Sequence, residues 1–188
     1  MARVLFLVLL VSGTYARAAS STTAGEAVVS TDGNHFSQRF SRGKNVIVVD
    51  VRVRAFQKAE HKLNLYEGAV QQVDGRQALG VDSGPPEGLK SEIVSIQVSW
   101  SGVRRSVDKR FFADCFNASA LPYRVLVSDD FRAVMITTDG GDGGGAYRVT
   151  WIVPKEGAVS RFVAGTDELT WKLPNKASHL AVRFAACR

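Results

Sequence analysis

Residues 94–100 read VSIQVSW, and this strict alternation of apolar and polar side chains is the pattern that decides the fold. Successive side chains of a β-strand point to opposite faces, so a period of two predicts a strand with one buried face. Similar runs recur at residues 47–53, 147–153, 169–173 and 180–184. Less regular stretches rich in strand-favouring residues lie at 123–127, 133–138 and 159–163. Period two therefore dominates the chain.

Turn-forming residues lie between these runs. They are Asp74-Gly75, Ser101-Gly102, and the stretches 128–130, 154–157 and 174–175. Short turns connect antiparallel neighbours, and no long helical pattern separates the runs, which argues against a parallel βαβ fold. We therefore predict an all-β chain, a single antiparallel β-sandwich or barrel-like domain of about 7–9 short strands.

The first residues have the pattern of a secretory signal peptide. Arg3 precedes an apolar run at residues 4–11, and Ala16 and Ala18 suit a signal peptidase. The run is much shorter than the roughly 20 residues of a membrane-spanning helix. We predict a cleaved signal at 1–18, a flexible N-terminal segment at 19–44 and one β domain at 45–188. The protein is then secreted or periplasmic, with no transmembrane segment after cleavage.

Composition and charge narrow the function classes. The chain has 188 residues, 45% of them hydrophobic, which suits one globular core and excludes a disordered or disulfide-dense chain. Removing residues 1–18 takes away two arginines and no acid, so the formal charge falls from +6 to +4. So weak a positive charge on an exported protein argues against a nucleic-acid partner. We expect an unknown protein or an envelope polymer instead.

One basic cluster adjoins two aromatic residues, with Arg104, Arg105, Lys109 and Arg110 ahead of Phe111-Phe112. It is either a patch for a polyanion or a solvated face beside core phenylalanines. We favour the second interpretation, because the overall charge is small.

The two cysteines, Cys115 and Cys187, predict one disulfide, since an oxidising compartment favours pairing. On the chain-entropy model such a bridge stabilises the fold by roughly 4 kcal/mol. A catalytic thiol is the less favoured alternative, because it needs a base such as His35, His61 or His179 close by.

Established catalytic motifs are missing. The chain has no G-x-S-x-G, no complete P-loop, no His-x-x-x-His and no Cys-x-x-Cys, so we assign no metal site and no catalytic residues. Residues 117–119 form an N-glycosylation sequon, which matters only in a eukaryotic source.

The most unusual feature is the glycine-rich stretch 139–145, DGGDGGG, between two predicted strands. It is either a long mobile hairpin loop or a ligand loop in which Asp139 and Asp142 bind Ca²⁺. Calcium takes about six to eight oxygen ligands and only two acids are local, so we favour the loop and expect no cofactor.

The sequence thus favours an exported β domain with a binding or structural role at the cell envelope or outside the cell, not an enzyme. One alternative is an extracellular or periplasmic hydrolase that uses a dispersed pair of carboxylates. Its candidate acids are Asp129, Asp130, Asp139, Asp142, Asp167 and Glu168. The other alternative is a secreted inhibitor of another protein, with the 139–145 loop as its probe.

Overall fold

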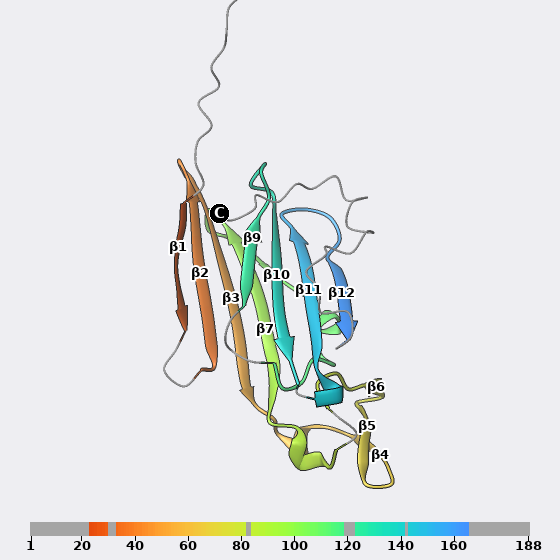
Figure 1. The fold of residues 1–188 in the computed structure, drawn as a ribbon. Helices are drawn as coiled ribbons and strands as arrows, with labels where there is room; N and C mark the ends of the chain where they lie inside the picture. Colours follow the sequence, from red (N-terminus) through yellow and green to blue (C-terminus); the bar gives the residue numbers. More distant parts are fainter. Residues whose placement is uncertain (1–22, 30–32, 82–83, 119–122, 142, 166–188) are drawn as a thin grey trace, which may run out of the picture.

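The computed structural model describes residues 23–29, 33–81, 84–118, 123–141 and 143–165. These residues form twelve strands in three antiparallel sheets, joined by four short 3-10 turns (Figure 1). The prediction of an all-β chain is confirmed, and in these ranges the sheets do not close into a barrel. The predicted signal peptide at 1–18 lies outside the described residues and stays a prediction.

The strands divide into two large sheets and one small sheet. The five-stranded sheet has the order β1 (Thr23–Val29), β2 (His35–Arg42), β3 (Asn45–Ala55), β7 (Ser91–Trp100) and β8 (Val103–Ser106). The four-stranded sheet has the order β12 (Ser160–Gly165), β11 (Tyr147–Pro154), β10 (Ala133–Gly140) and β9 (Arg124–Val127). The small sheet comprises β4 (Leu63–Tyr66), β5 (Ala69–Val73) and β6 (Arg76–Gln77). The 3-10 turns are η1 (Lys58–Glu60), η2 (Pro86–Gly88), η3 (Lys109–Phe111) and η4 (Gly143–Gly145).

One hydrophobic core joins the two large sheets (Figure 1). Strand β3 contributes Ile47, Val49 and Val51, which are fully buried and belong to the same cluster as Trp151 of β11. The alternation in the sequence therefore marks the faces that meet between the sheets. The buried indole Nε1 of Trp151 donates a hydrogen bond to the carbonyl of Phe111 at 2.8 Å, so this core donor has a partner.

Most predicted strands are present, but the total of about 7–9 was too low. Residues 47–53, 94–100, 147–153 and the three less regular runs became β3, β7, β11, β9, β10 and β12. The structure adds β1 and β2 within 19–44, the segment we predicted to be flexible. Strand β2 forms because Phe36 and Phe40 are buried in the core, although polar residues surround them in the sequence. The predicted strands at 169–173 and 180–184 lie outside the described residues.

One side chain of the opening stretch points the other way from the expected one. The pairing of β3 with β7 shifts register between Arg52 and Val53, as at a β-bulge. Beyond the shift Ile93 is buried and Val94 is 38% exposed, although the alternation places Val94 on the buried face with Ile96. A bulge of this kind leaves no signature in a period-two pattern.

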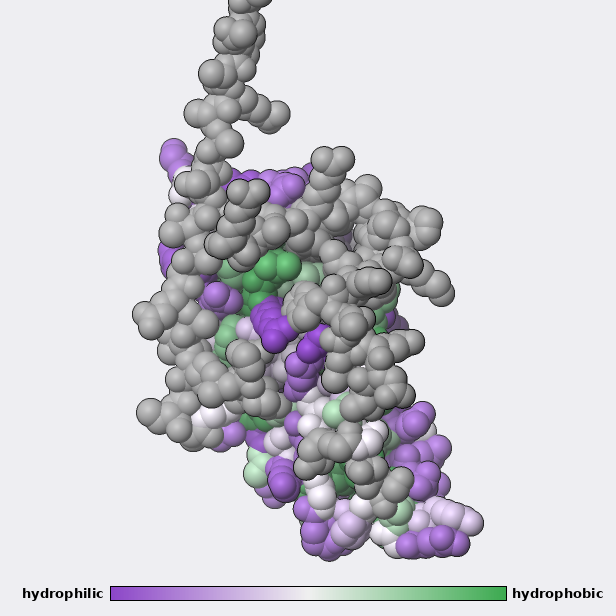
Figure 2. Space-filling model, in the orientation of Figure 1, coloured by the Kyte–Doolittle hydropathy of each residue, from purple (hydrophilic) through white to green (hydrophobic). Residues whose placement is uncertain are grey.

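The small sheet lies in an insert, residues 56–90, between two strands that are neighbours in the same sheet. Ala55 pairs with Ser91, and Phe56 N donates to Lys90 O at 3.0 Å, so the insert leaves and rejoins the sandwich at one place. It lies beyond the end of β3 and β7 (Figure 1). Its visible surface is largely hydrophilic (Figure 2), and it includes Tyr66, which is 66% exposed.

Asn117 fastens the insert to the sandwich. Its Nδ2 donates hydrogen bonds to the carbonyls of Gly80 at 2.8 Å and Gly88 at 2.7 Å. Its Oδ1 accepts from the backbone N–H of Lys90 at 2.7 Å and of Ser91 at 3.4 Å. The residue has φ = 52°, in the left-handed region that asparagine tolerates better than most residues. Because both Nδ2 hydrogens are donated, a glycan at this sequon is incompatible with the clasp.

Candidate functional site

Two of the acids considered for a hydrolytic pair hold local structure. Asp139, in β10, accepts from Arg148 Nε at 2.5 Å and Nη2 at 2.8 Å, and this hydrogen bonding lowers its pKa. Asp130 Oδ1 accepts from Ser128 Oγ at 2.6 Å and from Arg132 N at 3.1 Å. The Ser128 hydrogen bond is the main reason why the pKa of Asp130 is lowered. Both carboxylates are therefore charged and engaged within their own hairpins.

The other candidate acids give no further support to a pair. Asp142, Asp167 and Glu168 lie outside the described residues. Asp129 is in the turn between β9 and β10, where its backbone carbonyl accepts a hydrogen bond from Arg42.

The glycine-rich stretch starts as a tightly packed segment. A Cβ on Gly140 would lie 2.4 Å from the Tyr147 hydroxyl, and one on Gly141 would lie 2.6 Å from Gly80 Cα. These first two glycines leave room for neighbours, and the mobility expected of the 139–145 loop stays a prediction. Because Asp139 is paired with Arg148, its carboxylate is not a free ligand for Ca²⁺.

Cys115 is buried beside Arg161, whose Nη2 lies 3.5 Å from its Sγ, and it is a free thiol in the structure. Burial raises the pKa of Cys115 to about 12, which disfavours the thiolate and with it the catalytic alternative. Cys187 lies outside the described residues, so the Cys115–Cys187 disulfide stays a prediction.

His61 is held between two carboxylates of the insert and the sandwich. Its Nδ1 lies 2.8 Å from Asp74 Oδ2. Its Nε2 lies 3.0 Å from Glu92 Oε2, but this contact does not have the geometry of a hydrogen bond. Phe56 stacks on the imidazole at 4.8 Å between ring centroids. The backbone N–H of Lys62, and then His61, lower the pKa of Asp74 by hydrogen bonding.

The other histidine that the structure describes forms an ordinary pair with one acid. His35 Nε2 lies 3.1 Å from Asp50 Oδ1 on the pair β2 and β3, and His179 is outside the described residues. Across the described ranges, no three His, Cys, Asp or Glu side chains are grouped so as to hold a metal ion.

The basic cluster belongs partly to the scaffold. Arg105 donates to the carbonyls of Pro154 and Gly157, which ties β8 to the turn after β11. Phe112 is buried in the core, and the Arg110 guanidinium lies 4.9 Å from the centroid of the Phe111 ring. The favoured interpretation, core phenylalanines beside a solvated face, describes this region well.

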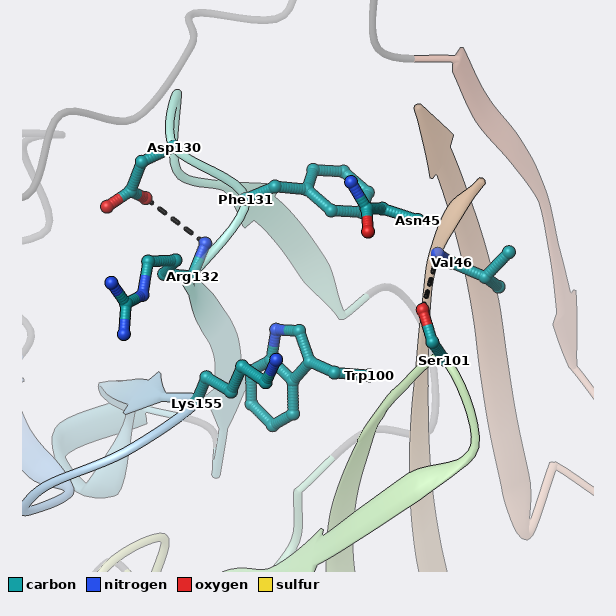
Figure 3. A pocket seen from close by; sticks show the side chains of 8 residues that line it. All are labelled: Asn45, Val46, Trp100, Ser101, Asp130, Phe131, Arg132 and Lys155. Carbon is teal, nitrogen blue, oxygen red and sulfur yellow. Dashed lines mark hydrogen bonds between the residues drawn. The ribbon is translucent and has the colours of Figure 1, made fainter. Parts of the chain in front are cut away.

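A cavity that the sequence did not indicate opens at one end of the sandwich (Figure 3). Its volume is about 190 Å³. Four separate segments line it: the start of β3, the end of β7, the turn between β9 and β10, and the residue after β11. The lining residues are Asn45, Val46, Trp100, Ser101, Asp130, Phe131, Arg132 and Lys155.

The indole nitrogen of Trp100 has no hydrogen-bond partner in this cavity. The residue is only 5% exposed, and its Nε1 is a buried donor from which no atom of the described residues accepts. In Figure 3 the five-membered ring with Nε1 faces the space enclosed by Phe131, Arg132 and Lys155. Buried polar groups nearly always have partners, and among the described residues Trp100 Nε1 is the one unpartnered buried atom of this kind that borders the cavity.

Two cations border the same space. Lys155 N donates to the carbonyl of Arg132 at 2.6 Å, which holds the two residues side by side. Arg132 Nη2 lies 3.6 Å from Glu156 Oε2, in a pair that is 63% and 75% exposed. Such an exposed pair contributes little stability, so the Arg132 guanidinium is only weakly held there.

Comparison with family models, curated proteins and solved structures finds no match for this chain. In the part of the chain that the structure describes, no helix has the length and apolarity to cross a membrane. The functional inference therefore depends on the geometry of the cavity.

Proposed function

We propose that this chain is an exported binding module and that the cavity around Trp100 is its ligand site. The observation that supports the proposal is the buried indole N–H of Trp100, which faces the cavity without a partner. Leaving such a donor unpaired costs about 1–3 kcal/mol, a cost that a bound acceptor removes. Binding sites commonly combine apolar walls with a few convergent polar groups, and the rings of Phe131 and Trp100 supply such walls here.

The size of the cavity favours a ligand over a single water molecule. A volume of about 190 Å³ is several times the roughly 30 Å³ that a water molecule occupies in the liquid. The occupant is a small molecule or one unit of an envelope polymer or protein. The hydrolase alternative has no comparable support, because Asp130 is the one acid among the lining residues, and its Oδ1 is occupied.

Nuclear magnetic resonance of the ¹⁵N-labelled protein tests the ligand site directly. The indole N–H signal of Trp100, assigned with Trp100→Phe, should shift when fragment mixtures or envelope extracts are added. The indole of Trp151 is an internal control, because its N–H already donates to Phe111 and should stay unchanged. If no fraction moves the Trp100 signal, or if both indoles move alike, the proposed site is wrong.

Export has its own test. Expressed with its first residues in a secreting host, the protein should leave the cytoplasm and begin at or near Ala19. Retention in the cytoplasm with residues 1–18 intact would contradict export without affecting the ligand site.

A further inference from the structure

We infer that the Trp100 cavity selects ligands carrying a carboxylate group, an inference that rests on the proposed function. The argument starts from the chemistry of the lining. An indole N–H, an ammonium group and a guanidinium group donate hydrogen bonds and accept none. Trp100, Lys155 and Arg132 therefore form a donor set, and its complement is an acceptor with negative charge.

Two of the acceptor atoms in the lining already carry hydrogen bonds from the protein, which works against neutral hydroxyl ligands. Ser101 Oγ accepts from Val46 N at 3.4 Å, and Asp130 Oδ1 accepts from Ser128 Oγ and Arg132 N. In Figure 3 the Asp130 carboxylate lies beside the Arg132 backbone rather than beside the Trp100 indole. A ligand that needs to donate at the indole end of the cavity finds little to accept its hydrogen bonds.

The charges point the same way. Two cations and one acid line the cavity, and the acid carries its own hydrogen bonds. The backbone bond from Lys155 to Arg132 places the two residues side by side at the cavity, and an anion bound there is attracted by both cations. Among the described residues, Lys155 forms no ion pair that competes with such an anion.

Size and wall chemistry limit the rest of the ligand. An apolar cavity of about 150 Å³ accommodates benzene, so a cavity of 190 Å³ accommodates a ring with a small substituent. The rings of Phe131 and Trp100 offer apolar contacts. Benzoate is thus a suitable probe, and benzamide is its matched neutral control with the same shape.

The experiment titrates the purified ¹⁵N-labelled protein with benzoate and with benzamide while the Trp100 indole signal is recorded. Benzoate should shift the signal with saturation, and benzamide should bind at least about tenfold more weakly, because it lacks the charge. Lys155→Gln and Trp100→Phe should each weaken the affinity for benzoate about tenfold. Binding to Trp100→Phe is followed by calorimetry, because this variant lacks the indole signal. Lys109→Gln, an exposed lysine that does not line the cavity, should leave the affinity unchanged.

The outcomes separate the two proposals. If benzamide binds as well as benzoate, or if Lys155→Gln has no more effect than Lys109→Gln, the carboxylate inference is overturned and the ligand site stands. If benzoate leaves the indole signal unmoved at concentrations at which benzamide shifts it, the inference is likewise overturned. If no compound of any charge moves the signal, the proposed function itself fails.

Discussion

Replacing Asn117 with alanine should be among the most destabilising single changes in this protein. The side chain makes three short hydrogen bonds, to Gly80 O, Gly88 O and Lys90 N, and one longer bond to Ser91 N. The methyl group of alanine can neither donate nor accept a hydrogen bond, so it replaces none of these contacts. The change therefore removes the hydrogen bonds by which this side chain holds the insert to the sandwich.

The expected size of the effect follows from these contacts. Three intramolecular hydrogen bonds at about 1 kcal/mol each give about 3 kcal/mol. The φ of 52° adds about 1 kcal/mol, because alanine is strained in the left-handed region. We expect a loss of about 4 kcal/mol, a large part of the roughly 5–15 kcal/mol that stabilises a typical domain.

Urea denaturation followed by tryptophan fluorescence measures this loss. Asn117→Gly removes the hydrogen bonds without the strain and should recover about 1 kcal/mol relative to Asn117→Ala. Asn117→Asp keeps an acceptor for Lys90 N but cannot donate to the two glycine carbonyls, so it should remain well below wild type. A loss under about 1 kcal/mol for Asn117→Ala, or a wild-type stability for Asn117→Asp, refutes the clasp.

Three further predictions follow from the described contacts. Asp74 has a lowered pKa, so its stabilising contribution is present above the unfolded value of 3.8 and is lost as the pH falls through the folded pKa. Wild type should therefore keep its advantage over Asp74→Asn at neutral pH and lose it as the pH falls below 3.8 in urea titrations; a constant difference would contradict this. Gly80→Ala should cost at least about 2 kcal/mol more than Gly102→Ala, because both glycines have positive φ but only Gly80 lacks room for a Cβ. Equal losses would show that the neighbours of Gly80 move aside to accommodate a Cβ, against this prediction. Non-reducing mass spectrometry of the exported protein should show Cys115 linked to Cys187, and two free thiols would contradict the disulfide.

The core strands were predictable because burial between two sheets imposes period two. Ile47, Val49 and Val51 alternate with polar residues, and the structure buries all three. Strand β2 escaped prediction because two phenylalanines, Phe36 and Phe40, anchor an otherwise polar stretch. The pattern is a property of local sequence, and it weakens where pairing with a neighbour decides the strand.

The cavity was not predictable for a related reason. Trp100 ends an alternating run and Lys155 lies in a predicted turn, but nothing in either segment indicates that the two meet. The residues that complete the site come from β3 and from the turn between β9 and β10. Sites assembled from several loops depend on strand order, which composition and periodicity do not contain. The acids that the sequence did single out, Asp130 and Asp139, are engaged by their own neighbours.

The shared exit and entry of the insert also has a consequence for how this fold can diversify. Because Phe56 N donates a hydrogen bond to Lys90 O, the insert leaves and rejoins the sheet at fixed positions. The entropic cost of closing a longer or shorter insert changes only slowly, by about 0.6 kcal/mol for each doubling of its length. Ala55 and Ser91 are therefore a natural point at which evolution or a protein engineer can exchange the insert, provided that the new one keeps the partners of Asn117, while the cavity lies at the opposite end of the sandwich.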